Sequence, residues 1–152
     1  MSYEFLEHTA DVKFKADGSN WEEMFNDAAS ALNETIRGNI KILELDEKSF
    51  EVDGKDLEIL LHNFLEEFVF LLDAKDFLVA RIKSISVELI EQGGKISCVV
   101  VGDKAQNYKF TNDVKAITFN EMVVKEEDSR YFCNVVLFCL LSYQRFYLKF
   151  AL

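Results

Sequence analysis

The tetrapeptide HTAD, at positions 8–11, is the most chemically concentrated segment in the first half of the chain. His8 and Asp11 could hold a divalent cation or act as base and acid, because hard cations prefer carboxylate oxygens and histidine titrates near neutral pH. The same residues are also typical of a bend, since Thr and Asp side chains hydrogen-bond to nearby backbone. The residue types alone favour a bend over a site.

A second polar segment is DVKAITFNEM, at residues 113–122. Lys115 opens an otherwise apolar strand, and Asn120 and Glu121 interrupt it. The spacing predicts a half-buried strand with a polar end, and it does not by itself define a site. His62 has Glu58 and Glu66 one helical turn away on either side, which indicates ordinary pairing along a helix face.

The composition narrows the classes of function. The chain has 152 residues with 17 basic and 27 acidic side chains, a net charge of -10. It lacks the basic footprint of a protein that binds nucleic acid strongly and directly. The three cysteines form no CxxC pair, which indicates buried free thiols. The N-terminal residues resemble no secretory signal, so we expect a cytoplasmic protein with no membrane association.

Two long helices are predicted. The first begins after Ser19, with Glu22 completing a capping box, and it ends at Gly38. The second runs over residues 55–72, capped by Asp53 or Asp56. It carries a broad apolar stripe, which predicts burial against a sheet and between layers. The stripe consists of Leu57, Leu60, Leu61, Phe64, Leu65, Phe68, Leu71 and Leu72.

The remaining segments alternate between apolar and polar residues, as strands do. Short strands are expected at residues 3–7 and 11–16, and either a strand pair or a loop and a strand at 39–52. A hairpin is expected to turn at Gly93 and Gly94, and a second hairpin to turn at 126–129. The predicted fold class is α+β, with two long helices packed on mostly antiparallel sheet in a single domain.

Four segments resemble the archease family: HTADV at 8–12, WEEMFNDAASAL at 21–32, LLHNFLEEFVFLLD at 60–73 and VKAITFNEM at 114–122. They occur in the family's order, and the resemblance covers residues 3–137. It implies a single archease-like domain, a sandwich, with an atypical tail at 138–152. It also implies an accessory protein rather than an enzyme, one that activates the tRNA-splicing RNA ligase by promoting its guanylylation and multiple turnover. The ligase protein is the expected partner.

The resemblance also assigns residues. It implies that family members bind a divalent cation, often calcium, and that Asp11 is a metal ligand. It implies that Lys115 is important for activity, and it places His8 among the functional residues of the HTAD motif.

The sequence departs from the family pattern at two positions. Asn120 stands where a histidine is frequent, and Phe138 stands where a second metal-binding aspartate is expected. We therefore expect this chain to bind divalent cations, calcium included, poorly. Two alternatives remain, an interaction module with a deficient metal site and a small acid-base enzyme using His8 and Asp11. The tail admits three interpretations: a membrane segment, a strand followed by an amphipathic helix, and a shifted reading frame.

Overall fold

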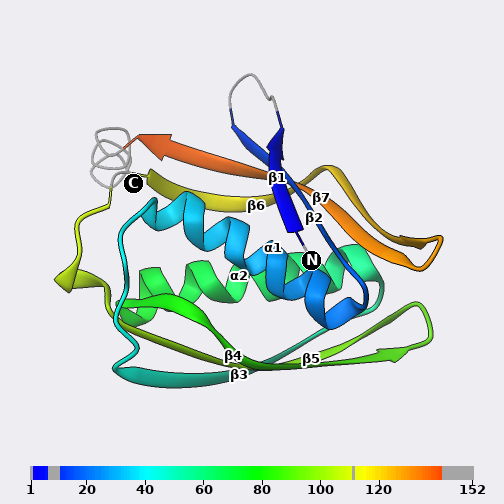
Figure 1. Ribbon diagram of the computed structural model, residues 1–152, viewed down its shortest axis with the longest axis horizontal. Coiled ribbons are helices and arrows are strands. Elements are labelled where there is room, and N and C mark those ends of the chain that lie inside the picture. Colours follow the sequence, from blue (N-terminus) through cyan, green and yellow to red (C-terminus); the bar gives the residue numbers. More distant parts are fainter. Residues whose placement is uncertain (1, 7–10, 111, 142–152) are drawn as a thin grey trace.

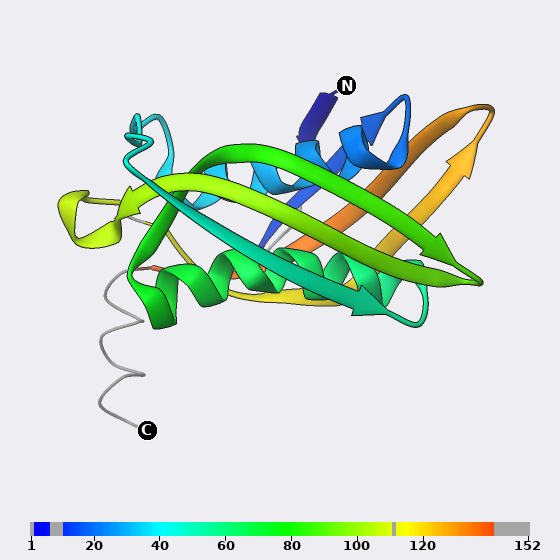
Figure 2. The ribbon, with the colours of Figure 1, turned by 90° about the horizontal axis from the view of Figure 1, so that it is seen from below.

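The computed structural model describes residues 2–6, 11–110 and 112–141. These residues form two antiparallel sheets with two long helices between them (Figures 1 and 2). One sheet has the strand order β1 (Ser2–Leu6), β2 (Val12–Gly18), β7 (Arg130–Leu141), β6 (Asn112–Glu127). The other has the order β3 (Asp46–Gly54), β5 (Gly93–Lys104), β4 (Phe77–Ile90), and a short 3-10 helix, Ala105–Asn107, follows β5. The predicted α+β sandwich is confirmed.

The first helix, α1 (Trp21–Arg37), begins one residue later than the sequence predicted. Asn20, not Ser19, is the N-cap, and its side chain accepts a hydrogen bond of 2.9 Å from the Glu23 backbone N–H. The Glu23 carboxylate in turn accepts from the backbone N–H and the hydroxyl of Ser19. The prediction that Glu22 completes the capping box is therefore wrong, because Glu23 makes these contacts. Gly38, at a φ of 65°, ends the helix as predicted.

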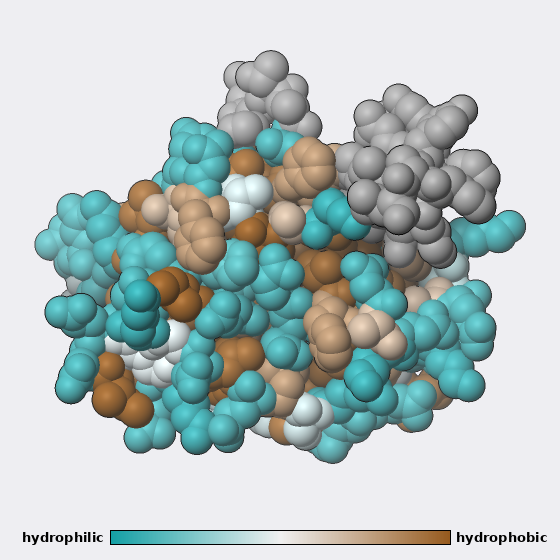
Figure 3. All heavy atoms as spheres, turned by 180° about the vertical axis from the view of Figure 1, so that it is seen from behind, coloured by the Kyte–Doolittle hydropathy of each residue, from teal (hydrophilic) through white to brown (hydrophobic). Residues whose placement is uncertain are grey.

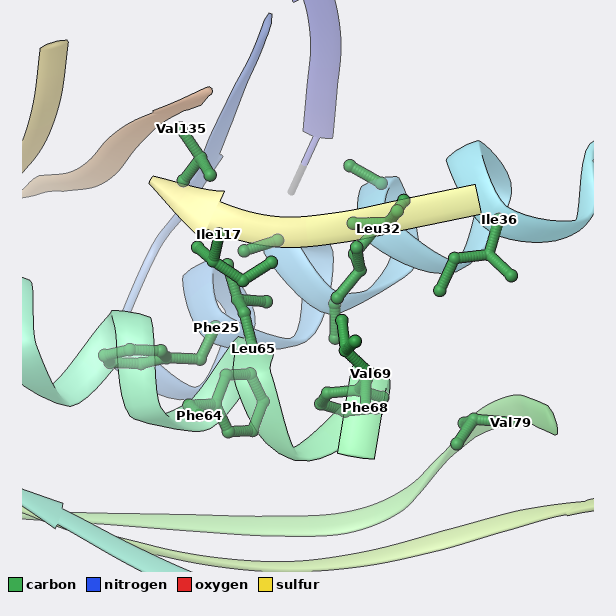
Figure 4. Packing of buried hydrophobic residues seen from close by; sticks show 14 of the residues in the cluster. Phe25, Leu32, Ile36, Phe64, Leu65, Phe68, Val69, Val79, Ile117 and Val135 are labelled. Atoms are coloured by element: carbon green, nitrogen blue, oxygen red, sulfur yellow. The ribbon is translucent and has the colours of Figure 1, made fainter. Parts of the chain in front are cut away.

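The second helix, α2 (Leu57–Lys75), is capped by Asp56, which accepts a 2.8 Å hydrogen bond from the Ile59 N–H. Its broad apolar surface is buried because it packs against β6 of one sheet and β3 of the other. Figure 4 shows Phe64 and Phe68 of α2 lying near Phe25 of α1 in the shared core. Burial between layers is thus confirmed, with Leu57 only partly buried.

The β4–β5 hairpin corrects one prediction. The turn consists of residues 91 and 92, with Glu91 at a φ of 57°, and Gly93 and Gly94 already belong to β5. A Cβ on Gly93 would lie 2.0 Å from the carbonyl oxygen of Gly54, the last residue of β3. The two glycines therefore serve close strand packing and not the turn.

The second hairpin forms as predicted, with β6 and β7 joined at Asp128 and Ser129, both at positive φ. Residues 39–52 form a loop followed by β3, which confirms one of the two alternatives.

Neither long helix of the described part of the chain combines the length and apolar character that crossing a bilayer requires. The interpretations of residues 142–152 lie outside the described residues.

Candidate functional site

Asp11 and the position of the expected second aspartate meet at one end of the four-stranded sheet. Asp11 immediately precedes β2, whose first residue, Val12, pairs with Leu137 of β7. Phe138 follows Leu137 directly. The two site positions therefore each lie one residue beyond the same cross-strand pair. Asp11 is partly buried, and His8 lies outside the described residues.

Lys115 reaches the same end of the sheet from the opposite side of β7. Phe138 pairs with Ala116 of β6, and Cys139 pairs with Val114. Lys115 occupies the bulge between these two pairs and is exposed. These three residues come from different parts of the sequence and lie at neighbouring positions. Asp11 immediately precedes β2, Phe138 lies on β7 and Lys115 lies on β6.

Phe138 is not a core residue. It is 40% exposed, whereas Leu137 is completely buried and belongs to the core. An exposed Phe in this position adds apolar surface beside Asp11. On the face seen in Figure 3, hydrophobic residues lie in small groups separated by hydrophilic ones.

The exposed polar interval in the middle of β6 is irregular. Pairing with β7 is interrupted between Thr118 and Val123, and Glu121 within this interval has a φ of 56°. The Glu121 carboxylate lies 3.4 Å from the ammonium of Lys13 on β2. The Thr118 hydroxyl donates a 2.9 Å hydrogen bond to the carbonyl of Val136, which holds β6 to β7 just before the interruption. The predicted half-buried strand is present, but Asn120 and Glu121 lie in the middle of β6, which continues to Glu127, and not at its end.

Helix α2 contacts the free edge of β6 through His62 and Glu66. The sequence predicted only that these two side chains pair along the helix face. The predicted pair is present, with His62 Nε2 3.6 Å from a Glu66 carboxylate oxygen. The same oxygen, Oε1, also accepts a 3.1 Å hydrogen bond from the backbone N–H of Ile117. The His62 ring stacks on Phe119, with centroids 4.3 Å apart and planes 14° from parallel. No short motif indicates these contacts, because they depend on how α2 packs against β6.

The oxygen ligands that the described residues offer near Asp11 do not fit a site that binds calcium tightly. Calcium prefers about six to eight oxygen ligands, several of them from carboxylates. Asp11 supplies one carboxylate, and the adjacent position is occupied by the apolar Phe138. Among the described residues, no three or more His, Cys, Asp or Glu side chains converge in a way that could hold a metal ion.

Burial raises the pKa of two cysteines and one aspartate away from this end. Burial raises the pKa of the Cys98 and Cys133 thiols to about 12, which makes them inert and agrees with the predicted free thiols. Asp27 on α1 is only 5% exposed, and its Oδ2 has no hydrogen-bond partner within the described part of the chain. Burial is the main cause of its raised pKa.

These features define a class of protein, a helix-centred sandwich of two antiparallel sheets with a polar site at the end of the larger sheet. A sequence profile of the Archease protein family matches residues 3–137. The chain belongs to the archease family.

Two curated relatives and two solved structures illustrate the match. "Protein archease" of Pyrococcus abyssi is 34% identical over 137 residues, covering 88% of this chain and 96% of that protein. "Protein archease" of Pyrobaculum neutrophilum is 37% identical over 128 residues, covering 82% and 86%. A solution structure from Methanobacterium thermoautotrophicum has a TM-score of 0.74 at 27% identity, covering 89% and 96%. An archease crystal structure from Thermotoga maritima, at 18% identity and a TM-score of 0.55, covers 87% and 93% and supports the fold alone.

Proposed function

We propose that this protein is a cytoplasmic accessory protein that activates the tRNA-splicing RNA ligase, promoting its guanylylation and multiple turnover without performing chemistry itself. The observation that supports this function is the meeting of Asp11 and Lys115 at one end of the sheet. These are the two residues for which the family resemblance implies the clearest roles.

Lys115 would act by presenting its ammonium group to the ligase. The side chain is exposed in a chain of net charge -10, so it offers a local positive charge on an otherwise acidic protein. Phosphate or carboxylate groups at the ligase active site are suitable partners for a compact ammonium. Asp11 lies at the same end of the sheet, and we propose that it holds calcium only weakly because the neighbouring position 138 carries Phe in place of a carboxylate.

The test is a multiple-turnover ligation assay with the cognate ligase, GTP and RNA halves ending in a 2′,3′-cyclic phosphate. The wild-type protein should increase the number of turnovers per ligase, and Lys115→Ala should lose most of that stimulation. Lys41→Ala is the matched control, because Lys41 is an exposed lysine in the loop before β3. The proposal is wrong if the wild-type protein leaves ligation unchanged.

Phe138 specifically favours a second candidate, an interaction module that binds the ligase without using a metal. The two candidates differ in the effect of calcium on thermal stability. A ligand that binds only the native state stabilises it by about 2.7 kcal/mol at a hundredfold excess over its Kd. A melting temperature that does not respond to calcium, combined with ligase stimulation, would support the module.

A further inference from the structure

We propose that Glu66 of α2 is a positioning residue that fixes β6 and thereby sets the place of Lys115; this role rests on the function proposed above. Strand β6 is at the edge of the four-stranded sheet, with β7 on one side and no strand of the described residues on the other. An edge strand has backbone groups that no neighbouring strand satisfies. The position of Lys115 therefore depends on what holds this edge.

The ladder next to Lys115 is short. It lies between the bulge at Lys115 and the interruption after Thr118, and it consists of the pairs formed by residues 116–118 of β6 with residues 138–136 of β7. A paired run of this length is at the lower limit of strands in globular proteins, about three residues, so pairing to β7 alone holds it weakly. Additional contacts on the free edge are needed to define its position.

Glu66 supplies such a contact at the middle of this run. Its carboxylate accepts the N–H of Ile117, the central residue, on the edge that faces α2. His62, one turn earlier on α2, lies beside Glu66 and stacks on Phe119. Two successive turns of α2 therefore contact two positions of β6.

The helix is a rigid support for this contact. The opposite side of α2 is buried in the core, where Phe64, Leu65 and Phe68 pack between the sheets (Figure 4). A helix held by a close-packed core cannot shift easily. The Glu66 carboxylate is itself 37% exposed, so its removal leaves no cavity in the core.

The test compares Glu66→Ala with Glu66→Gln, because Gln keeps an oxygen acceptor of the same reach and Ala does not. Glu67→Ala is the matched control, since Glu67 is the adjacent carboxylate on α2 and does not accept from Ile117. In Glu66→Ala, amide hydrogen exchange at Ile117 should be about tenfold faster or more, with Glu66→Gln and Glu67→Ala close to wild type. Exchange at the buried Phe64 should stay unchanged, which excludes global destabilisation.

The ligation assay provides the second readout. Glu66→Ala should lower the stimulated kcat by about tenfold at unchanged KM, because small displacements of a functional group cost rate more than binding. Glu66→Gln should restore stimulation to within about twofold of wild type. Equal stimulation by wild type and Glu66→Ala would overturn the proposal, and so would equal impairment by Glu66→Ala and Glu66→Gln. If the wild-type protein does not stimulate the ligase, the proposed function fails, and exchange at Ile117 still decides whether Glu66 fixes the strand.

Discussion

Replacing Phe138 with aspartate would place a second carboxylate beside Asp11. Val12 and Leu137 are a cross-strand pair, so the next positions outward, Asp11 and Phe138, lie close together. Side chains on directly opposite residues have Cβ atoms about 4.5–5.5 Å apart. Two carboxylates at this separation can reach one cation.

The expected magnitude follows from two terms. Phe138 is 40% exposed, so replacing it forfeits the burial of roughly half of its ring surface, about 1–2 kcal/mol. Two like charges about 4 Å apart repel by about 1 kcal/mol in water and by more near a protein surface. Without a cation, Phe138→Asp should therefore lower the stability of the fold by about 2–3 kcal/mol. Calcium at a hundredfold excess over Kd should recover about 2.7 kcal/mol of this loss.

The assay is thermal denaturation with and without calcium, combined with calorimetric titration. It uses Phe138→Asp in the full chain and in a chain ending after Leu141. Phe138→Asn is the control, because it removes the ring without adding charge. Tight calcium binding by the natural chain would refute the placement of the second ligand at this position. Equally weak binding by the natural chain and both Phe138→Asp chains would show that a second carboxylate is not sufficient.

Three further outcomes are expected. Asp11→Asn should weaken the calcium affinity of the Phe138→Asp protein and leave its circular dichroism spectrum unchanged; equal affinities in titration calorimetry would remove Asp11 from the site. Lys115→Ala should change the free energy of unfolding by less than ~0.5 kcal/mol, since Lys115 is exposed, and a larger loss in urea denaturation would mean that its main role is structural. Asp27→Asn should raise the melting temperature at pH 7, because burial raises the pKa of Asp27 and its ionisation then disfavours the folded state. This advantage should disappear below the ordinary pKa range of Asp, where the wild-type carboxyl is protonated in both states; the same advantage at pH 3 and pH 7 would contradict the burial argument.

The helices and hairpins could be predicted because their signals are local. The 3.6-residue apolar period of α1 and α2 and the alternation of the strands depend only on which side chains face the core. The turn between β4 and β5 could not be predicted in this way. A Gly-Gly pair is a common turn signal, but Gly93 is required here by the approach of Gly54, which belongs to a strand distant in sequence.

The site was predictable only in part for a related reason. Asp11 and Lys115 were indicated by the family resemblance, and their proximity then follows from the pairing of β2, β7 and β6. The contact between Glu66 and Ile117 has no local signal, because Glu66 looks like any exposed acid on a helix. Only the packing of α2 along the edge of β6 gives it a second partner.

The exposure of Phe138 also bears on whether the natural chain needs a cation. If Phe138 merely continued the buried face of β7 through Val136, it would be buried as Val136 is, but it is 40% exposed. The departure from the family pattern therefore changes the chemistry of the surface beside Asp11 and leaves the core intact. A chain that keeps Lys115 on an intact sheet should stimulate the ligase without calcium. At fixed magnesium concentration, calcium titration should leave stimulation by the natural chain unchanged and should increase stimulation by Phe138→Asp. A calcium-dependent rise with the natural chain would show that Asp11 recruits a cation without a carboxylate at position 138.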